Sequence, residues 1–135
     1  MKAYFSRRYR ISASHRLHSE ELSDEENGKV YGKCNNPHGH GHNYTVEVTV
    51  GGQVDPETGM VVNLCHLDSC VNREILERFD HQNLNLCAEF QDRVPTTENL
   101  CIAIYGILAR SFHGAALVRV RIEETANNFF EYSGR

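Results

Sequence analysis

Three segments of the chain alternate polar and apolar residues with a period of two, and this pattern is the strongest constraint on its fold. The segments are Tyr9–Leu17, Asn43–Val50 and Ala116–Glu124. Successive side chains of a strand point to opposite faces of a sheet, so each segment predicts a strand with one buried face. A last strand is expected at Phe129–Tyr132. Alternation of this kind is typical of an antiparallel sheet.

Two stretches have the apolar spacing of amphipathic helices. The first is expected at about Leu64–Arg78, with Asn63 as its N-cap, and the second begins at Pro95–Glu98, which offers a capping threonine and an early acid. Gly114 is expected to end the second helix. The predicted order is β-β-α-α-β-β, an α+β arrangement.

Composition limits the class of protein. A chain of 135 residues that is 40% hydrophobic fits one domain, residues 1–135. A net charge of −4 argues against a nucleic-acid or membrane-surface binder, and no apolar run approaches the roughly 20 residues that span a bilayer. The N-terminal segment lacks the apolar stretch of a secretory signal, and five cysteines without a CxxC pair suggest free thiols. The expected location is the cytoplasm.

The histidines are the most informative residues for function. His38, His40 and His42 fall within five residues, and His15 lies on the apolar face of the first predicted strand. Three converging imidazoles with an open fourth position make a catalytic zinc site. His15, His40 and His42 meet this condition if the second strand extends back to His40, although spacing alone leaves His38 as an alternative. Exposed or core histidines are the structural alternative.

Other candidate residues surround this cluster. Cys34 precedes it in a polar, turn-rich loop, Ser19–Gly39, and could act as a base or nucleophile or be a fourth metal ligand. The adjacent pair Asp80–His81 could relay protons. Glu124 lies on an apolar strand face and would either bind a donor-rich ligand or form a salt bridge with an arginine.

His66 and Cys70 stand one helical turn apart, but no third metal ligand accompanies them, so a core role for Cys70 is preferred.

Seven segments, in order along the chain, resemble the 6-pyruvoyl tetrahydropterin synthase family. They are ISASHRL (Ile11–Leu17), LSDEEN (Leu22–Asn27), GKCNNPHGHGHNY (Gly32–Tyr44), DPETGMVVNL (Asp55–Leu64), DHQNL (Asp80–Leu84), TTEN (Thr96–Asn99) and ET (Glu124–Thr125). The resemblance implies a T-fold (tunnelling fold) with two helices on one face of the sheet, and three subunits joined in a barrel. Two such trimers would stack as a homohexamer with active sites between subunits.

The resemblance also implies roles for individual residues. Zn²⁺ would be held by His15, His40 and His42, and Cys34 would be the base. Asp80 and His81 would be its relay partners, Glu124 would anchor the pterin, and Thr97 and Glu98 would line the same pocket. Arg16 and Lys33 flank the site and are possible triphosphate contacts.

The implied activity is a zinc-dependent lyase reaction that converts 7,8-dihydroneopterin triphosphate to 6-pyruvoyl tetrahydropterin plus triphosphate in tetrahydrobiopterin biosynthesis. The alternative is 6-carboxy-5,6,7,8-tetrahydropterin synthase of queuosine biosynthesis. The duplicated HGH sequence keeps this alternative open, since Cys34 has five residues between it and His40 but only three before His38, the spacing of the carboxy-forming enzymes.

Overall fold

A five-stranded sheet forms the centre of the computed structural model, which describes residues 1–135. The strand order is β3-β1-β2-β4-β5. The strands are β1 (Lys2–His15), β2 (His40–Gln53), β3 (Gln82–Asn83), β4 (Ala116–Thr125) and β5 (Asn128–Tyr132). All neighbouring strands are antiparallel except β1 and β3. The expected antiparallel sheet is confirmed, with the short parallel strand β3 as an addition at one edge.

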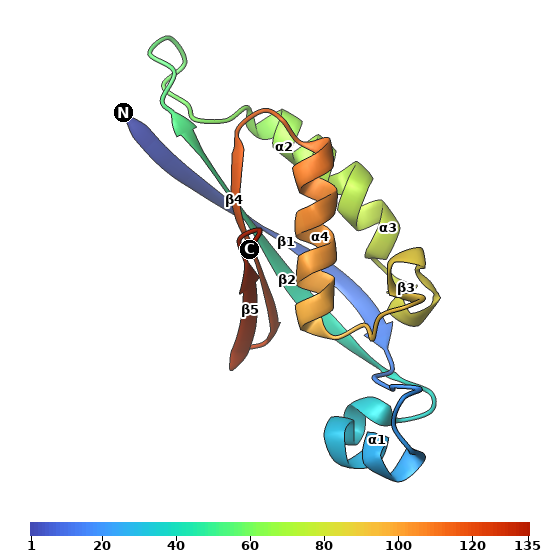
Figure 1. Cartoon of the computed structure of the whole chain (residues 1–135). Coiled ribbons are helices and arrows are strands. Elements are labelled where there is room, and N and C mark those ends of the chain that lie inside the picture. Colours follow the sequence, from blue (N-terminus) through green and yellow to red (C-terminus); the bar gives the residue numbers. More distant parts are fainter.

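The helices cover one face of this sheet, as the resemblance implied. They are α2 (Leu64–Val71), α3 (Glu77–Phe79) and α4 (Thr97–Ser111), and they lie together against the strands in Figure 1. The core contains buried side chains from both layers, including Tyr44 and Ile122 from the sheet and Leu67 and Ile104 from the helices. The opposite face of the sheet carries polar residues. No helix of the structure is long and apolar enough to cross a membrane.

The predicted helix at Leu64–Arg78 is present but is not uniform. A π-helical segment, Asn72–Leu76, joins α2 to α3, so the helical run ends at Phe79. Helix α4 ends at Ser111 and not at Gly114. Phe112 adopts an extended backbone and is only 7% exposed. Leaving the helix at this point lets the Phe112 side chain join the core.

Strand β1 begins seven residues before the predicted start at Tyr9 and ends at His15, before Leu17. The prediction missed its first half because Arg7 interrupts the apolar alternation. In the structure the Arg7 Nε lies 3.0 Å from an Asp68 carboxylate oxygen on α2, and the Tyr9 hydroxyl donates to the same oxygen at 2.7 Å. Arg7 therefore lies on the helix-facing side of β1, where the Asp68 carboxylate pairs with its charge.

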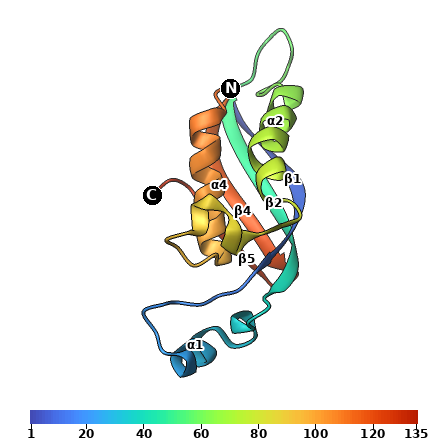
Figure 2. The same ribbon diagram turned by 90° about the vertical axis from the view of Figure 1, so that its right-hand side faces the viewer.

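The polar excursion between β1 and β2 contains a helix that the sequence analysis did not predict. Helix α1 (Asp24–Tyr31) lies apart from the sheet and the other helices in both views (Figures 1 and 2). Ser23 and Glu26 form a capping box at its start. The buried Asn27 side chain donates to the backbone oxygens of Ser19, Leu22 and Ser23 and accepts from the Ser19 nitrogen. Buried amide hydrogen bonds thus replace an apolar core in this segment.

Strands β1 and β2 form one long hairpin whose register sets the positions of the histidines. His15 is paired with His40, and Ala13 with His42. Gly39, just before β2, has a φ of +71°, and a Cβ atom there would lie 2.9 Å from the His15 carbonyl oxygen. The chain enters β2 through a backbone conformation and a close contact that both favour glycine.

Candidate metal centre and adjoining cleft

Three imidazoles converge at the end of the β1–β2 hairpin. The Nε2 atoms of His15 and His40 are 3.3 Å apart, and those of His40 and His42 are 2.8 Å apart. The three rings stand nearly perpendicular to one another. His40 and His42 are two residues apart on one strand and so point to the same face, while the hairpin register brings His15 opposite His40.

The ring of His15 is oriented by Pro95, two residues before the start of α4. Its Nδ1 lies 2.8 Å from the carbonyl oxygen of Pro95 and 3.2 Å from the Tyr44 hydroxyl. Because a carbonyl oxygen can only accept, Nδ1 carries the proton and Nε2 presents its lone pair to the cluster. A histidine whose other nitrogen donates to a backbone carbonyl is the usual arrangement of a metal ligand.

Burial favours the neutral form of His15 and His42, the form that binds metals. Burial lowers the pKa of His15, which is 1% exposed, below the usual histidine value. Burial also lowers the pKa of His42, a shift that the nearby Glu124 carboxylate opposes. Neutral imidazole is the state required for coordination.

The donor atoms fit a metal ion. Tetrahedral zinc with nitrogen ligands at about 2.0–2.1 Å places those nitrogens about 3.3–3.4 Å apart. The His15–His40 separation of 3.3 Å agrees, whereas the His40–His42 separation of 2.8 Å is shorter. Two groups of potential ligand atoms lie within 4.8 Å of one another, namely His15, Cys34 and His40, and His15, His42 and Glu124. The site can therefore bind a metal ion.

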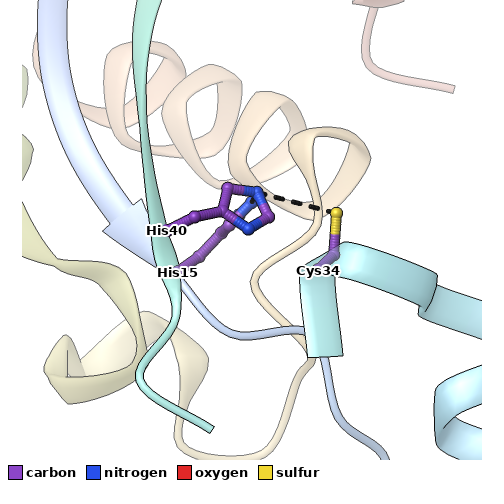
Figure 3. Close-up of side chains that lie close together, drawn as sticks. All are labelled: His15, Cys34 and His40. Atoms are coloured by element: carbon purple, nitrogen blue, oxygen red, sulfur yellow. Dashed lines mark hydrogen bonds between the residues drawn. The ribbon is translucent and has the colours of Figure 1, made fainter. Parts of the chain in front are cut away.

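Cys34 is held over the cluster by its own loop. It belongs to the 3₁₀ turn η1 (Gly32–Asn35), and its Sγ lies 3.6 Å from Nε2 of His40, the approach drawn in Figure 3. Its carbonyl oxygen accepts a 2.7 Å hydrogen bond from the Leu17 nitrogen, which ties η1 to the end of β1. Burial, followed by the negative charge of Glu124, raises the pKa of the Cys34 thiol.

An open cleft of about 600 Å³ lies beside the metal centre. Its lining contains Cys34, His40 and His42, together with Gly32, Lys33 and Asn36. This volume is within the range of small-molecule sites. The thiol and two of the three imidazoles therefore face one space that a ligand can enter.

Glu124 joins this group from β4. Its Oε1 lies 3.2 Å from Nε2 of His42, and its Oε2 accepts from Asn128 at 3.1 Å. The side chain is 16% exposed. No arginine pairs with it, so the salt bridge considered from the sequence is not formed.

Asp80 and His81 are not brought to Cys34 within the chain. Asp80 Oδ1 accepts from the Ser12 nitrogen, and the His81 nitrogen donates to the Ser12 oxygen. His81 has a φ of 59° and is 81% exposed. It lines a second cavity, whose lining also includes Ser12, Asn43 and His42 but not Cys34. No hydrogen bond or ion pair connects this pair to the metal centre.

The remaining candidates differ in their burial and in their contacts. Thr97 is buried in the first turn of α4, two residues after Pro95, and its hydroxyl has no hydrogen-bond partner. Glu98 and His38 are exposed, and His38 is outside the ligand groups. Lys33 lines the cleft, whereas Arg16 Nε donates to the Asn35 oxygen.

His66 is exposed while Cys70 is buried against Ser111, so these two form no site.

Sequence reasoning missed the residues that support the histidines and the thiol. Tyr44 and Pro95 were interpreted only as a strand and a helix-start residue, yet both contact Nδ1 of His15. Asn35 donates to the Leu17 oxygen at 2.7 Å and braces the turn that carries Cys34. A search for a partner of each ligand's second nitrogen would have pointed to a carbonyl, but its position depends on the tertiary fold.

The fold and the site define an α+β protein with three convergent histidines at the end of a long hairpin, where a metal ion could bind, and a thiol in the adjoining cleft. The 6-pyruvoyl tetrahydropterin synthase family model matches residues 4–135, and the chain belongs to that family. The solved structure of 6-pyruvoyl tetrahydropterin synthase from Caenorhabditis elegans superposes with a TM-score of 0.93 at 42% identity, covering 100% of this chain and 97% of that chain. The fold is thus the T-fold.

Individual relatives agree with this assignment. The chain is 51% identical over 132 residues to 6-pyruvoyl tetrahydrobiopterin synthase of Poecilia reticulata, covering 97% of this chain and 90% of the relative. It is 49% identical to the human protein of the same name, covering 98% and 92%. A 6-carboxy-5,6,7,8-tetrahydropterin synthase of Aquifex aeolicus is more distant, at 28% identity and 98% coverage of both chains.

Proposed function

We propose that the protein is a zinc-dependent lyase that converts 7,8-dihydroneopterin triphosphate to 6-pyruvoyl tetrahydropterin and triphosphate, in tetrahydrobiopterin biosynthesis. The observation that carries the proposal is the Cys34 thiol, 3.6 Å from His40, beside a triad of convergent imidazoles. Binding alone would need no such thiol, whereas an elimination needs a group that moves protons. Relatives about half identical to the chain bear the corresponding enzyme name.

His15, His40 and His42 would hold the zinc ion. When bound, the ion would polarise the oxygens of the substrate side chain and make the adjacent C–H bond more acidic. Cys34 would accept the proton from that carbon, because its sulfur faces the cleft beside His40. The Pro95 carbonyl would keep His15 in the tautomer that offers Nε2.

Glu124 would bind the pterin ring. A carboxylate accepts two hydrogen bonds from the adjacent amino and ring N–H groups of a pterin, and the charge strengthens both. Thr97, in the first turn of α4, and Glu98 are assigned to the same pocket by their position in the TTEN segment.

Asp80 and His81 would complete the proton relay from a neighbouring subunit of a homohexamer. Their separation from Cys34 within one chain supports this arrangement, as does the exposure of His81. Co-expression of Cys34→Ala with His81→Ala tests it. If sites are shared between subunits, mixed assemblies regain activity that neither variant has alone, and no recovery would contradict a shared site.

The identity of the product tests the function directly. Purified protein incubated with 7,8-dihydroneopterin triphosphate is expected to yield 6-pyruvoyl tetrahydropterin and triphosphate by mass spectrometry. If 6-carboxy-tetrahydropterin and acetaldehyde were the main products, the carboxy-forming alternative would replace the proposal. The five free cysteines fit action in a reducing compartment, the cytoplasm.

A further inference from the structure

The Cys34 thiol has a single hydrogen-bond partner. Its Sγ approaches Nε2 of His40 at 3.6 Å and forms no other hydrogen bond. Figure 3 shows the sulfur pointing from its turn toward the rings of His15 and His40, which come from the opposite side. The sulfur is therefore aimed at the point where the imidazole lone pairs meet.

Two spacings match those of a coordination shell, whereas the His40–His42 nitrogen separation of 2.8 Å is shorter than such a shell requires. In a tetrahedral zinc site, a sulfur at about 2.3 Å and a nitrogen at about 2.0–2.1 Å from the ion lie about 3.5–3.6 Å apart. The observed Sγ–Nε2 distance is 3.6 Å, and the His15–His40 nitrogen separation is 3.3 Å. The ligand atoms of His15, Cys34 and His40 all lie within 4.8 Å of one another.

Glu124 is the competing donor for the same position. Its Oε1 lies 3.2 Å from His42, but its other oxygen is bound by Asn128, which draws the carboxylate toward the β4–β5 turn. Zinc accepts thiolate readily, and the Cys34 sulfur has no second partner to lose. The hydrogen bond from the Leu17 nitrogen to the Cys34 oxygen holds the turn in place.

We propose that Cys34 is the fourth ligand of the metal ion when no pterin is bound. The thiol gives its proton to solvent, and the sulfur donates a lone pair to the ion, as coordinating thiols do. This inference rests on the metal site of the proposed function and adds a step to it. Cys34 caps the resting site, so the substrate must take its place on the ion before the thiolate can act as a base.

Cobalt-substituted protein tests the cap without an activity assay. Cobalt(II) bound to a thiolate has a sulfur-to-metal charge-transfer band in the near ultraviolet, and histidine and carboxylate ligands give none. The band is expected in the pterin-free protein, should disappear in Cys34→Ala and Cys34→Ser, and should remain in Cys65→Ala, which removes an exposed thiol. The zinc Kd of Cys34→Ala should rise at least about 10-fold.

Two results would overturn the inference: no band in protein that holds cobalt by elemental analysis, or a band that persists in both Cys34 variants. Failure to bind cobalt or zinc at all would contradict the cap and the proposed function together. A charge-transfer band in a protein without synthase activity would support the cap and contradict the proposed function alone.

Discussion

Glu124 Oε1 lies 3.2 Å from Nε2 of His42, so the carboxylate on β4 contacts the end of β2 that carries the proposed metal ligands. The two strands pair directly, with Thr45 opposite Glu123. A ligand that is held by Glu124 would consequently lie beside the imidazoles. Substitutions at Glu124 and at His42 test the proposed anchor and the proposed metal site one at a time.

Glu124→Gln is expected to weaken pterin binding while leaving zinc in place. The neutral amide offers one accepting oxygen and loses the charge, and hydrogen bonds to charged groups contribute about 1.5–3 kcal/mol, or about 10- to 150-fold in Kd. Equilibrium dialysis with a pterin measures the change. The matched control is Glu123→Gln, whose carboxylate pairs with Arg121. An unchanged pterin Kd in Glu124→Gln would remove Glu124 as the anchor.

His42→Ala should lose zinc, and His38→Asn should retain it. His42 contacts the Nε2 of His40 at 2.8 Å, whereas the His38 side chain is exposed and outside the ligand groups. Elemental analysis after dialysis against metal-free buffer gives the zinc content of each variant. Full occupancy in His42→Ala, or loss in His38→Asn, would mean that the ligands were assigned to the wrong HGH sequence.

Cys34→Ala should abolish turnover while the fold is kept. Proton-transfer groups contribute typically ~10²–10⁴-fold, and kcat at saturating zinc is expected to fall by that factor. Circular dichroism checks the fold, and zinc and pterin binding at saturating concentrations should persist. Cys65→Ala, at an exposed position, serves as the control. Near-normal turnover in Cys34→Ala would eliminate the thiol as the base.

Asn27→Ala should loosen helix α1 without unfolding the sheet. The substitution leaves the backbone groups of Ser19, Leu22 and Ser23 without their buried partner. Each such loss costs about 1–3 kcal/mol, so the α1 amides should exchange hydrogen about 5- to 150-fold faster. Native-state hydrogen exchange measures this, with the exposed Asn72→Ala as the control. Unchanged protection of α1 would show that Asn27 does not hold it.

Cys101 should make the protein less stable at alkaline pH. Burial, followed by the charge of Glu131, raises the pKa of its thiol from 9.0 to about 12. The folded state keeps the proton that the unfolded state loses, so this stabilisation is complete below pH 9.0 and is lost as pH rises toward 12.

The measurement is urea unfolding at pH 8 and pH 10. Above the pKa of the Cys101 thiol in the unfolded state, the free energy of unfolding of the unmodified protein should fall by about 1.4 kcal/mol per pH unit. This fall is relative to the free energy of unfolding of Cys101→Ala at the same pH. Cys65→Ala serves as the exposed control. Parallel pH dependence in the unmodified protein and Cys101→Ala would show that Cys101 makes no such contribution.

Alternation and capping were sufficient to predict four of the five strands of the sheet, β1 in part, and the two long helices. The strand at Ala116–Glu124 was predicted to within one residue because Val120 and Ile122 alternate cleanly with arginines, and both are buried in the structure. Face parity also brought His15, His40 and His42 to one side. These features depend on local periodicity, which is visible in a single sequence.

The missed features depend on long-range or polar contacts. Helix α1 has no apolar stripe, and only the capping box of Ser23 and Glu26 marked its start. The exposed position of His81 follows from the binding of Asp80 and His81 to Ser12, nearly seventy residues earlier. The adjacency of Asp80 and His81 in the sequence gave no indication that both residues would lie apart from Cys34.

Gly39 also explains how the protein chooses between its two overlapping HGH sequences. If β2 slid by two residues so that His38 and His40 took the places of His40 and His42, Pro37 would occupy the position of Gly39. Proline cannot adopt a φ of +71°, and its side chain would meet the His15 carbonyl at 2.9 Å. The same slip would force His42 into the buried position of Tyr44. The backbone conformation at Gly39 therefore favours His40 and His42, rather than His38 and His40, as the proposed ligand pair.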